Sequence, residues 1–514
     1  MVILSEDNER TQGEDAQDSN IRAGKAVANS VRTTLGPKGM DKMLVGSSGD
    51  VTITNDGATI LNKMDIEHPA AQMLVEVAET QEIEVGDGTT TAAVLAGELL
   101  AEAEELLDQD LHPTVIVEGY HEAAKLAHEA IDEQTLAIDL DDDTLEAVAR
   151  SSMTGKGTGD VTVEALAKPV VSAVQQVATD AGVDREDIHI HTHPGASTSA
   201  TELIEGVVID ETPLDDTAPR QLADVATAIV DTDIEFDTGE SDAEYNISDV
   251  DQLNEAIAAE EAELEAYAET IVDAGIELLF ATGDIDDRVA SRLASEGVVA
   301  FEDIDSSDAD AIAAATGARQ LGTLEDIEDS DLGTTASLNV KSYGEDTFTF
   351  VEGADTAHVS LFVRGSTDHV VDELERALND ALDVVIAALD AGGVVGGAGA
   401  SEIAIADHVR SHAAGVEGRK QLAIEAFATA VDELPRTLAE NTGMDPIDAL
   451  VDLRARHDAQ GRAGLVSTGR SGNVGDPVEE NILDPAAVKH EAVDSATEAA
   501  TMILRIDDVI SSDN

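Results

Sequence analysis

The stretch Gly86-Asp87-Gly88-Thr89-Thr90-Thr91 is followed at once by residues 92–100, in which Leu95 and Leu99 recur at helical spacing. The two glycines permit a tight turn, and such a turn would open onto a helix N-terminus whose free N–H groups attract anions. A carboxylate at this point would repel a bare phosphate, so Asp87 points to a bridging cation, most plausibly Mg²⁺. The alternative is an acidic turn with a threonine as N-cap, and the hexapeptide alone favours neither interpretation.

Other turns could contribute to the same site. Residues 21–35 have the spacing of a helix, with Asn20 as a possible cap, and Leu35 to Gly39 forms a second candidate phosphate loop. The turn Asn55-Asp56-Gly57 follows two short predicted strands at residues 43–45 and 51–54. The glycine-flanked Lys156 in the stretch Ser151 to Gly157 is, taken alone, more typical of a surface loop.

Charge is the dominant anomaly of the composition. The 514 residues include 108 Asp and Glu against 29 Lys and Arg, for a net charge of −79, and the acids are spread along the whole chain. Such a chain would repel nucleic acid and anionic membranes. At about 1 M salt the Debye length falls to about 3 Å, which screens the self-repulsion. We therefore expect a protein adapted to molar salt, as in salt-loving archaea.

The remaining composition excludes several classes of protein. The chain has no cysteine, so disulfides, thiolate metal sites and thiol nucleophiles are excluded. It has neither an apolar run long enough for a transmembrane helix nor a basic and apolar leader like that of a signal peptide. These features predict a cytoplasmic protein, and its length predicts several domains.

The middle of the chain has a different sequence pattern. From about 207 to 362, short apolar strands alternate with helical segments, which predicts a separate α/β domain. One amphipathic helix there, from about Leu253 to Ile271, has a polar face that is nearly all Glu. Just before this region His189, His191 and His193 would share one strand face. A metal site is one interpretation, but no fourth ligand is apparent and a polar outer face is the simpler one.

The assembled motifs resemble a known family. They match the group II chaperonins, the archaeal thermosome family related to the eukaryotic cytosolic chaperonin, in the family's order and over nearly the whole chain. Each motif is weak alone and the set is highly specific. The matching segments are Arg32 to Met43, Thr54 to Leu61, Gly86 to Thr91, Ser151 to Lys156, Glu375 to Ala381, Gln421 to Asn441 and Met502 to Ile510.

The resemblance implies a multidomain chaperonin fold made by two insertions. The mostly α-helical equatorial ATP-binding domain would comprise 1–140 and 398–514, and the small α/β intermediate hinge domain 141–206 and 363–397. The α/β apical domain, 207–362, would bind clients and carry a helical lid protrusion near 250–271. The implied function is ATP-dependent enclosure of unfolded proteins in a double ring with a built-in lid, without a separate co-chaperonin cap. Other subunits of the ring, identical or not, would be the partners.

The resemblance also implies roles for individual residues in binding and hydrolysing ATP with Mg²⁺. Asp87 matches the Mg²⁺ ligand. Asp380 matches the residue that activates the attacking water, and Asp56 a second carboxylate that helps to place it. Lys156 matches the sensor of the γ-phosphate, and Asp484 an acidic residue near the ribose. The matching nucleotide-binding positions are Gly36, Pro37, Gly88, Thr89, Thr90, Thr91, Gly397 and Gly399.

One departure from the family keeps a second function open. The family's glycine triplet reads Gly397-Ala398-Gly399 here, and the middle alanine is costly if its φ is positive. Weakened nucleotide binding would leave a ring subunit with weak or no ATPase that acts as a passive holdase. An ordinary small-molecule kinase is not supported, because the chain has no Walker loop. The client range and the number of subunits in a ring cannot be read from the chain.

Overall fold

The computed structural model describes residues 8–47, 49–156, 162–179, 181–215, 217–236, 250–324, 327–353, 358–467 and 472–512. Gly157 and the side chain of Leu253 lie outside this description. The chain divides into two compact units. The helical unit comprises Met1–Ser172, Pro194–Ala200 and Arg364–Asn514, and the sheet unit comprises Ala173–His193 and Thr201–Val363. The three domains implied by the resemblance divide the chain differently, since the predicted intermediate domain has residues in both units, and they stay a prediction. None of the described helices is both long and apolar enough to cross a membrane.

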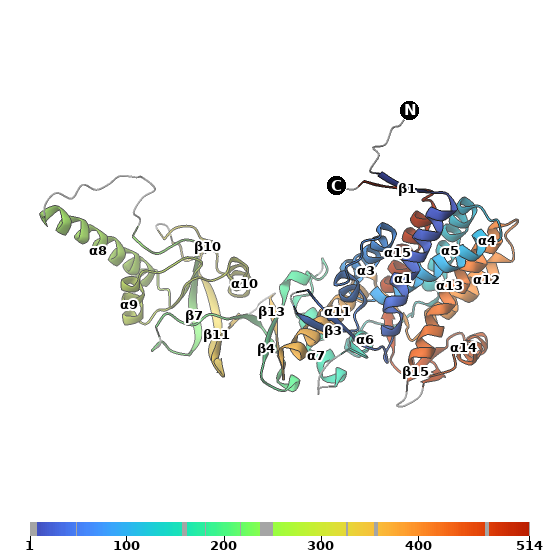
Figure 1. Ribbon diagram of the computed structural model, residues 1–514. Helices are drawn as coiled ribbons and strands as arrows, with labels where there is room; N and C mark the ends of the chain where they lie inside the picture. The colour runs from blue at the N-terminus through green and yellow to red at the C-terminus, as the bar shows by residue number, and fades with distance from the viewer. Residues whose placement is uncertain are drawn as a thin grey trace. The chain divides into compact units, whose positions relative to one another are not determined.

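Long helices that lie side by side build the core of the helical unit (Figure 1). Their apolar stripes meet in one large buried cluster, because Ala, Val, Leu and Ile recur at helical spacing along each of them. Tyr120 and Phe427 meet edge to face in this cluster, with ring centroids 5.9 Å apart. The helices are α1 (Glu14–Val31), α3 (Pro69–Val85), α4 (Thr89–Asp108), α5 (Pro113–Gln134), α12 (Ala400–Ala413), α13 (Lys420–Asn441) and α15 (Ala486–Leu504).

The first helix begins earlier than its spacing predicts. It starts at Glu14, so the expected cap Asn20 lies inside the helix, where it is buried. Glu14 and Asp15 occupy the first turn, where negative charge is favoured by the helix dipole. The prediction of Asn20 as the cap is therefore wrong, because the acidic residues before it are helical.

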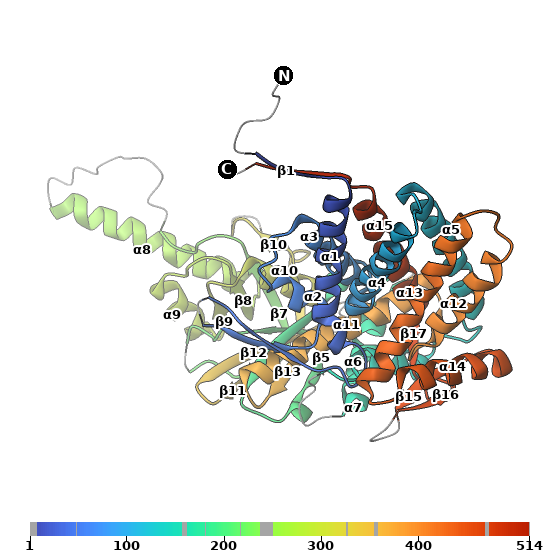
Figure 2. The same ribbon diagram turned by 45° about the vertical axis from the view of Figure 1, so that its right-hand side comes forward.

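Shorter elements complete the helical unit. The predicted strands are confirmed as the hairpin β2 (Lys42–Val45) and β3 (Val51–Thr54). Figure 2 shows α14 (Pro446–Gln460) beside the hairpin of β15 (Gly464–Ser467) and β16 (Gly472–Gly475). The others are η1 (Arg32–Thr34), α2 (Gly57–Asn62), α6 (Asp142–Met153), the part of α7 (Val163–Val177) up to Ser172, α11 (Asp368–Ala391), and β14 (Val394–Gly396) paired with β17 (Leu483–Pro485).

The two chain ends meet in the helical unit. β1 (Asn8–Gln12) pairs antiparallel with β18 (Asp508–Ser512), and Arg10 forms an ion pair with Asp508 across them (Figure 1). The apolar C-terminal segment thus finds its partner strand within its own chain.

The sheet unit is the predicted α/β region. Its main sheet has the strand order β6-β12-β11-β7-β8-β9, with β10 also paired to β7. β7, β8 and β9 run parallel, and helices connect them. The strands are β6 (Gly206–Ile209), β7 (Gln221–Val230), β8 (Leu278–Ala281), β9 (Val299–Phe301), β10 (Gln320–Leu321), β11 (Gly333–Tyr343) and β12 (Asp346–Gly353), and the helices α8 (Val250–Asp273), α9 (Asp287–Glu296) and α10 (Ser306–Thr316).

The predicted amphipathic helix is α8. Leu264 and Ile271 are buried against the sheet, whereas Ile257, nearer the start, is 44% exposed. In both views this end of α8 extends beyond the sheet of its own unit (Figures 1 and 2). Among the described side chains of the helix, the apolar face is thus covered at Leu264 and Ile271 and open at Ile257.

The histidine strand is β4 (Ile188–Pro194), in a small sheet with β13 (Val359–Gly365) and β5 (Glu202–Ile204). The expected polar outer face is wrong, since none of its three histidines is exposed. His191 and His193 pack on Phe348, while the Nε2 atoms of His189 and His358 lie 3.3 Å apart. Burial lowers the pKa of His191 and of His189. Within the described residues, no group of three or more His, Asp or Glu is arranged to hold a metal ion.

Candidate functional site

The turn at Gly86 to Gly88 joins α3 to α4. Gly86 ends α3 with φ at 69°, and Gly88 precedes α4 with φ at 83°, so both adopt the left-handed conformation that favours glycine. A Cβ added at Gly86 would also lie 2.2 Å from the Cβ of Asp383. Gly88 is the cap residue of α4 and no side chain caps the helix. The alternative interpretation, a threonine N-cap, is therefore wrong.

The second predicted loop lies against this turn. Gly36 has φ at 83°, and an added Cβ would lie 2.3 Å from Leu438. The hydroxyl oxygens of Thr34 and Thr90 are 3.4 Å apart, which brings the two loops together. The amide of Asn441 donates to the carbonyl oxygen of Leu35 at 2.8 Å and so fixes the loop to α13.

The glycine-rich stretch forms a third turn, at the start of α12. Gly399, with φ at 84°, is the cap residue, and again no side chain caps the helix. Ala398 has φ at 57°, the conformation in which alanine is costly. Its carbonyl accepts a hydrogen bond from the N–H of Leu465 at 2.8 Å, and Gly397 donates to the carbonyl of Ile482 at 3.0 Å. Backbone bonds on both sides hold the alanine in this conformation.

These turns line one cavity of about 490 Å³, which lies entirely within the helical unit. Most of the predicted site residues line it: Gly36, Pro37, Asp56, Asp87, Gly88, Thr89, Thr90, Thr91, Lys156, Gly399 and Asp484. Gly397 and Asp380 stand just behind the wall. A Cβ on Gly397 would lie 2.9 Å from a carboxylate oxygen of Asp484, and Asp380 forms an ion pair with Lys156. Segments from both ends of the sequence thus meet in one place.

A buried ion pair dominates the electrostatics of the cavity. Lys156 and Asp380 are nearly inaccessible, with side chains 15% and 14% exposed. Burial raises the pKa of Asp380 to about 7, against the opposing effect of the Lys156 ammonium. Desolvation lowers the pKa of Lys156, but the attraction of Asp380 and Asp87 outweighs it, so the net shift is upward. Burial likewise raises the pKa of Asp87. The site therefore concentrates negative charge that a cation could offset.

Asp56 has two partners. One carboxylate oxygen caps α2 by accepting the N–H of Thr59 at 2.6 Å, and the other accepts the hydroxyl of Thr89 at 3.2 Å. The carboxylate turn thus both begins a helix and touches the start of α4.

Sequence reasoning missed several charged residues of the cavity wall, among them Lys489 and Glu402. Lys489 lies 2.8 Å from a carboxylate oxygen of Asp484 and 2.9 Å from one of Glu402. Desolvation opposes the protonated form of this buried lysine, but the two carboxylates prevail and its pKa is raised. The scarcity of basic residues could have pointed to Lys489, because a lysine near a predicted site is notable in a chain with only 29 Lys and Arg.

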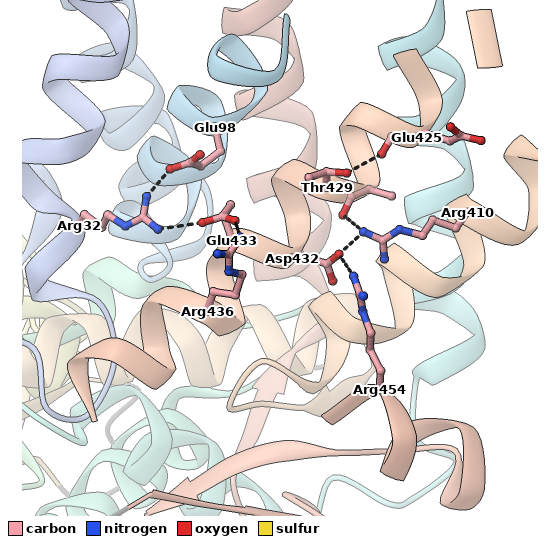
Figure 3. Close-up of polar contacts among 10 residues, drawn as sticks. Arg32, Glu98, Arg410, Glu425, Thr429, Asp432, Glu433, Arg436 and Arg454 are labelled. Carbon is pink, nitrogen blue, oxygen red and sulfur yellow. Dashed lines mark hydrogen bonds and ion pairs between the residues drawn. The ribbon is translucent and has the colours of Figure 1, made fainter. Parts of the chain in front are cut away.

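Two ion-pair clusters on α13 brace the helices behind the cavity (Figure 3). In one, Arg32 bridges Glu98 of α4 and Glu433 of α13, directly before the loop that begins at Leu35. In the other, the buried carboxylate of Asp432 receives Arg410 from α12 and Arg454 from α14. The helices that carry the turns are therefore joined by charge as well as by apolar packing.

The donor set of the cavity fits a magnesium nucleotide. No side chain caps the N-termini of α4 and α12, so their N–H groups, together with the Lys156 ammonium, could receive phosphate oxygens. The partly buried carboxylate of Asp87 is the kind of oxygen ligand that Mg²⁺ prefers, and a cation there would offset its desolvation. The volume lies in the usual range for small-molecule sites, about 300–1,000 Å³.

Comparison with known proteins identifies the family of the chain. The model of the TCP-1/cpn60 chaperonin family matches residues 27–514. "Thermosome subunit 3" of Haloferax volcanii is 64% identical over 515 residues, covering 100% of this chain and 98% of the relative. "Thermosome subunit alpha" of Halobacterium salinarum is 50% identical, covering 100% and 91%, and "Thermosome subunit" of Methanopyrus kandleri 48% identical, covering 100% and 95%. The predicted salt adaptation fits the two halophilic organisms. The chain belongs to the TCP-1/cpn60 chaperonin family.

Proposed function

We propose that this chaperonin subunit binds unfolded proteins and encloses them in a double-ring cavity whose lid closes on ATP hydrolysis. The observation that carries the proposal is the convergence of three glycine turns, two uncapped helix N-termini and the Lys156–Asp380 pair on one cavity. Phosphoryl transfer needs positioning and charge neutralisation more than covalent chemistry, and this arrangement provides both.

The residues around the turns would hold the nucleotide. Gly36 and Pro37 would lie against the phosphates together with Gly88 and the three threonines that follow it. Gly397 and Gly399 would lie beneath the nucleotide, and Asp484 would lie near the ribose. Asp87 would hold Mg²⁺, which when bound neutralises phosphate charge.

The residues behind the phosphates would carry the hydrolysis. Asp380 would orient the attacking water and accept its proton, a contribution of about 10²–10⁴-fold to the rate. Asp56 would help to place the water, and Lys156 would contact the γ-phosphate. The ion pair between Lys156 and Asp380 supports this assignment, because it holds the proposed base next to the proposed phosphate sensor.

The domain layout follows from the same proposal. An equatorial domain of 1–140 and 398–514 would hold the nucleotide, and a hinge of 141–206 and 363–397 would join it to an apical domain of 207–362. The extension of α8 beyond its sheet supports a role as the lid protrusion. The ring would contain further subunits of this kind, and no separate cap would be needed.

A refolding assay in molar KCl tests the proposal. A denatured client is diluted into the parental protein or the Asp380→Ala variant, with ATP and Mg²⁺, and its recovered activity is followed together with phosphate release. We expect ATP-dependent recovery with the parent, and a phosphate release at least about 10²-fold slower with the variant. Equal hydrolysis by both proteins would refute the role of Asp380.

The positive φ of Ala398 favours one alternative, a subunit with weak or no ATPase that acts as a passive holdase. A holdase would suppress aggregation of the client equally with and without ATP. The parent and Asp380→Ala would then both release little or no phosphate. The same assay therefore separates the two functions, and electron microscopy of the sample would show whether rings are present.

A further inference from the structure

Gln81 lies directly beneath the turn that carries Asp87. It belongs to α3, is completely buried, and does not line the cavity. Its side-chain Nε2 donates to the carbonyl oxygen of Asp87 at 2.7 Å and to that of Val488 at 3.2 Å. Both partners are carbonyl acceptors, so they define which end of the amide carries the hydrogens.

The first of these bonds fixes one peptide plane. The carbonyl of Asp87 and the N–H of Gly88 belong to the same peptide, and that N–H donates to the Oδ1 of Asp87 at 2.8 Å. Gln81 thus holds one end of the plane while the carboxylate of Asp87 is tied to the other. A Cβ added at Gly88 would lie 2.9 Å from the Nε2 of Gln81, so the amide packs against the turn without a gap.

The second bond reaches Val488, which also lines the cavity and belongs to a segment distant in sequence. Val488 precedes Lys489, the ammonium of which lies 2.8 Å from a carboxylate oxygen of Asp484. One buried amide therefore links the turn with Asp87 to the segment that holds Asp484.

The amide is only partly satisfied. The Oε1 of Gln81 is buried and has no hydrogen-bond partner among the described residues. An apolar side chain of the same length would avoid this unsatisfied acceptor, but it would leave the carbonyls of Asp87 and Val488 without their donor. The amide therefore acts through the two bonds that it donates, and both of these bonds end on segments of the cavity wall.

We propose that Gln81 is a positioning residue for the magnesium nucleotide. By orienting the peptide of Asp87, it would set the direction of the carboxylate toward Mg²⁺ and its spacing from the segment that holds Asp484. The inference rests on the proposed function, in which Asp87 holds the metal. Gln81 itself would touch neither the metal nor the nucleotide.

The test compares Gln81→Met, which keeps the length but removes both donors, with Gln72→Met as a matched control. Gln72 lies on the same helix, is exposed, and donates through Nε2 to the carbonyl of Ile66. Binding of a fluorescent ADP analogue is titrated with MgCl₂ in molar KCl, and thermal unfolding is recorded for each variant without nucleotide. We expect Gln81→Met to raise the half-saturating Mg²⁺ concentration about tenfold or more, as loss of a supporting hydrogen bond typically does. Gln72→Met should match the parent.

The unfolding data separate positioning from packing. Positioning predicts that Gln81→Met needs more Mg²⁺ for half-saturation, in addition to any fall in melting temperature caused by the two carbonyls left without a donor. A lower melting temperature with an unchanged half-saturating Mg²⁺ concentration would refute the inference. Should Gln81→Met fail to fold, Gln81→Leu removes the same donors with a shorter apolar side chain, and the same Mg²⁺ criterion applies. If the parent and Asp87→Asn bind the analogue alike at every Mg²⁺ concentration, the proposed metal role of Asp87 fails, and the inference with it.

Discussion

Ala398 is a residue in a backbone conformation that suits glycine. Its φ of 57° costs an alanine roughly 1–2 kcal/mol relative to the right-handed region. The bond from the N–H of Leu465 to its carbonyl, and the turn before α12, hold it there. The strain is local and leaves the neighbouring Gly399 free to cap the helix.

Ala398→Gly should therefore stabilise the helical unit. Relief of the strain exceeds the extra entropy that glycine gives the unfolded chain, for a net gain of about 0.5–1 kcal/mol. Thermal unfolding in molar KCl measures it, with Ala404→Gly as the control. Ala404 lies in the interior of α12, so the same change there should cost about 1 kcal/mol. A loss of stability at both positions would show that Ala398 is not strained.

Asp380 should make hydrolysis depend on pH near neutrality. Burial raises its pKa to about 7, and a protonated carboxyl cannot accept a proton from water. The ATPase rate should therefore be low at acidic pH and rise through an apparent pKa of about 7. The stability of the protein without nucleotide should have the opposite pH dependence, for the same reason. Between the ordinary value of 3.8 and about 7 the folded state binds a proton that the unfolded state lacks, so this group's contribution to stability falls as pH rises.

A second carboxyl must be separated from Asp380 in that profile. Burial raises the pKa of Glu82 to about 7 as well. Glu82→Gln should keep the pH profile, whereas Asp380→Asn should be nearly inactive at every pH. If the pH profile of Glu82→Gln loses its inflection, the titrating group is Glu82 and not Asp380.

At the scale of elements, the sequence pattern predicted the features that depend on a few neighbouring residues. The hairpin of β2 and β3 and the glycines at Gly86 and Gly88 were predictable, because turn chemistry and alternation act over a few residues. The start of α1 was not, because its acidic first turn reads like a loop. His191 and His193 of β4 pack on Phe348 of β12, which is distant in sequence, and no local pattern indicates such a neighbour.

The site shows the same division. The resemblance supplied Asp380 and Lys156, which lie far apart in the chain and which spacing alone could not have paired. Gln81 and Lys489 were not predicted from the sequence, because Lys489 pairs with the distant Glu402 and Gln81 donates to the backbone carbonyl of the distant Val488. Their roles become visible only once the helices are packed.

The helix α13 offers a test of how charge joins elements. Asp432 is only 4% exposed and receives guanidinium groups from α12 and α14, which are themselves 32% and 45% exposed. Asp432→Asn should destabilise the helical unit by about 1–3 kcal/mol, less than for a fully buried pair because water can reach the arginines. Chemical denaturation measures the loss, with Arg292→Ala as the control, because the exposed pair of Arg292 and Glu296 should contribute at most about 0.5 kcal/mol. Equal losses would contradict the assigned role of Asp432.

At the scale of the whole molecule, the net charge of −79 sets the conditions in which this chaperonin can stay folded. Repulsion among exposed carboxylates extends about 10 Å at 0.1 M salt and about 3 Å at 1 M. Pairs such as Lys489 and Glu402, with side chains 12% and 7% exposed, are screened much less. Salt should therefore remove the long-range repulsion while the buried pairs persist.

The melting temperature should accordingly rise as KCl increases from 0.1 to about 2 M. Each 1 kcal/mol of repulsion relieved corresponds to about 2–4 °C for a domain of 150–250 residues. Because screening depends on ionic strength, NaCl at the same concentration should raise the melting temperature by nearly the same amount. The rise with salt should level off near 1 M, whereas an uncharged osmolyte should not show this levelling. Equal melting temperatures in low and high KCl would show that the acidic surface carries no folding penalty. In that case the composition would need a different explanation from adaptation to molar salt.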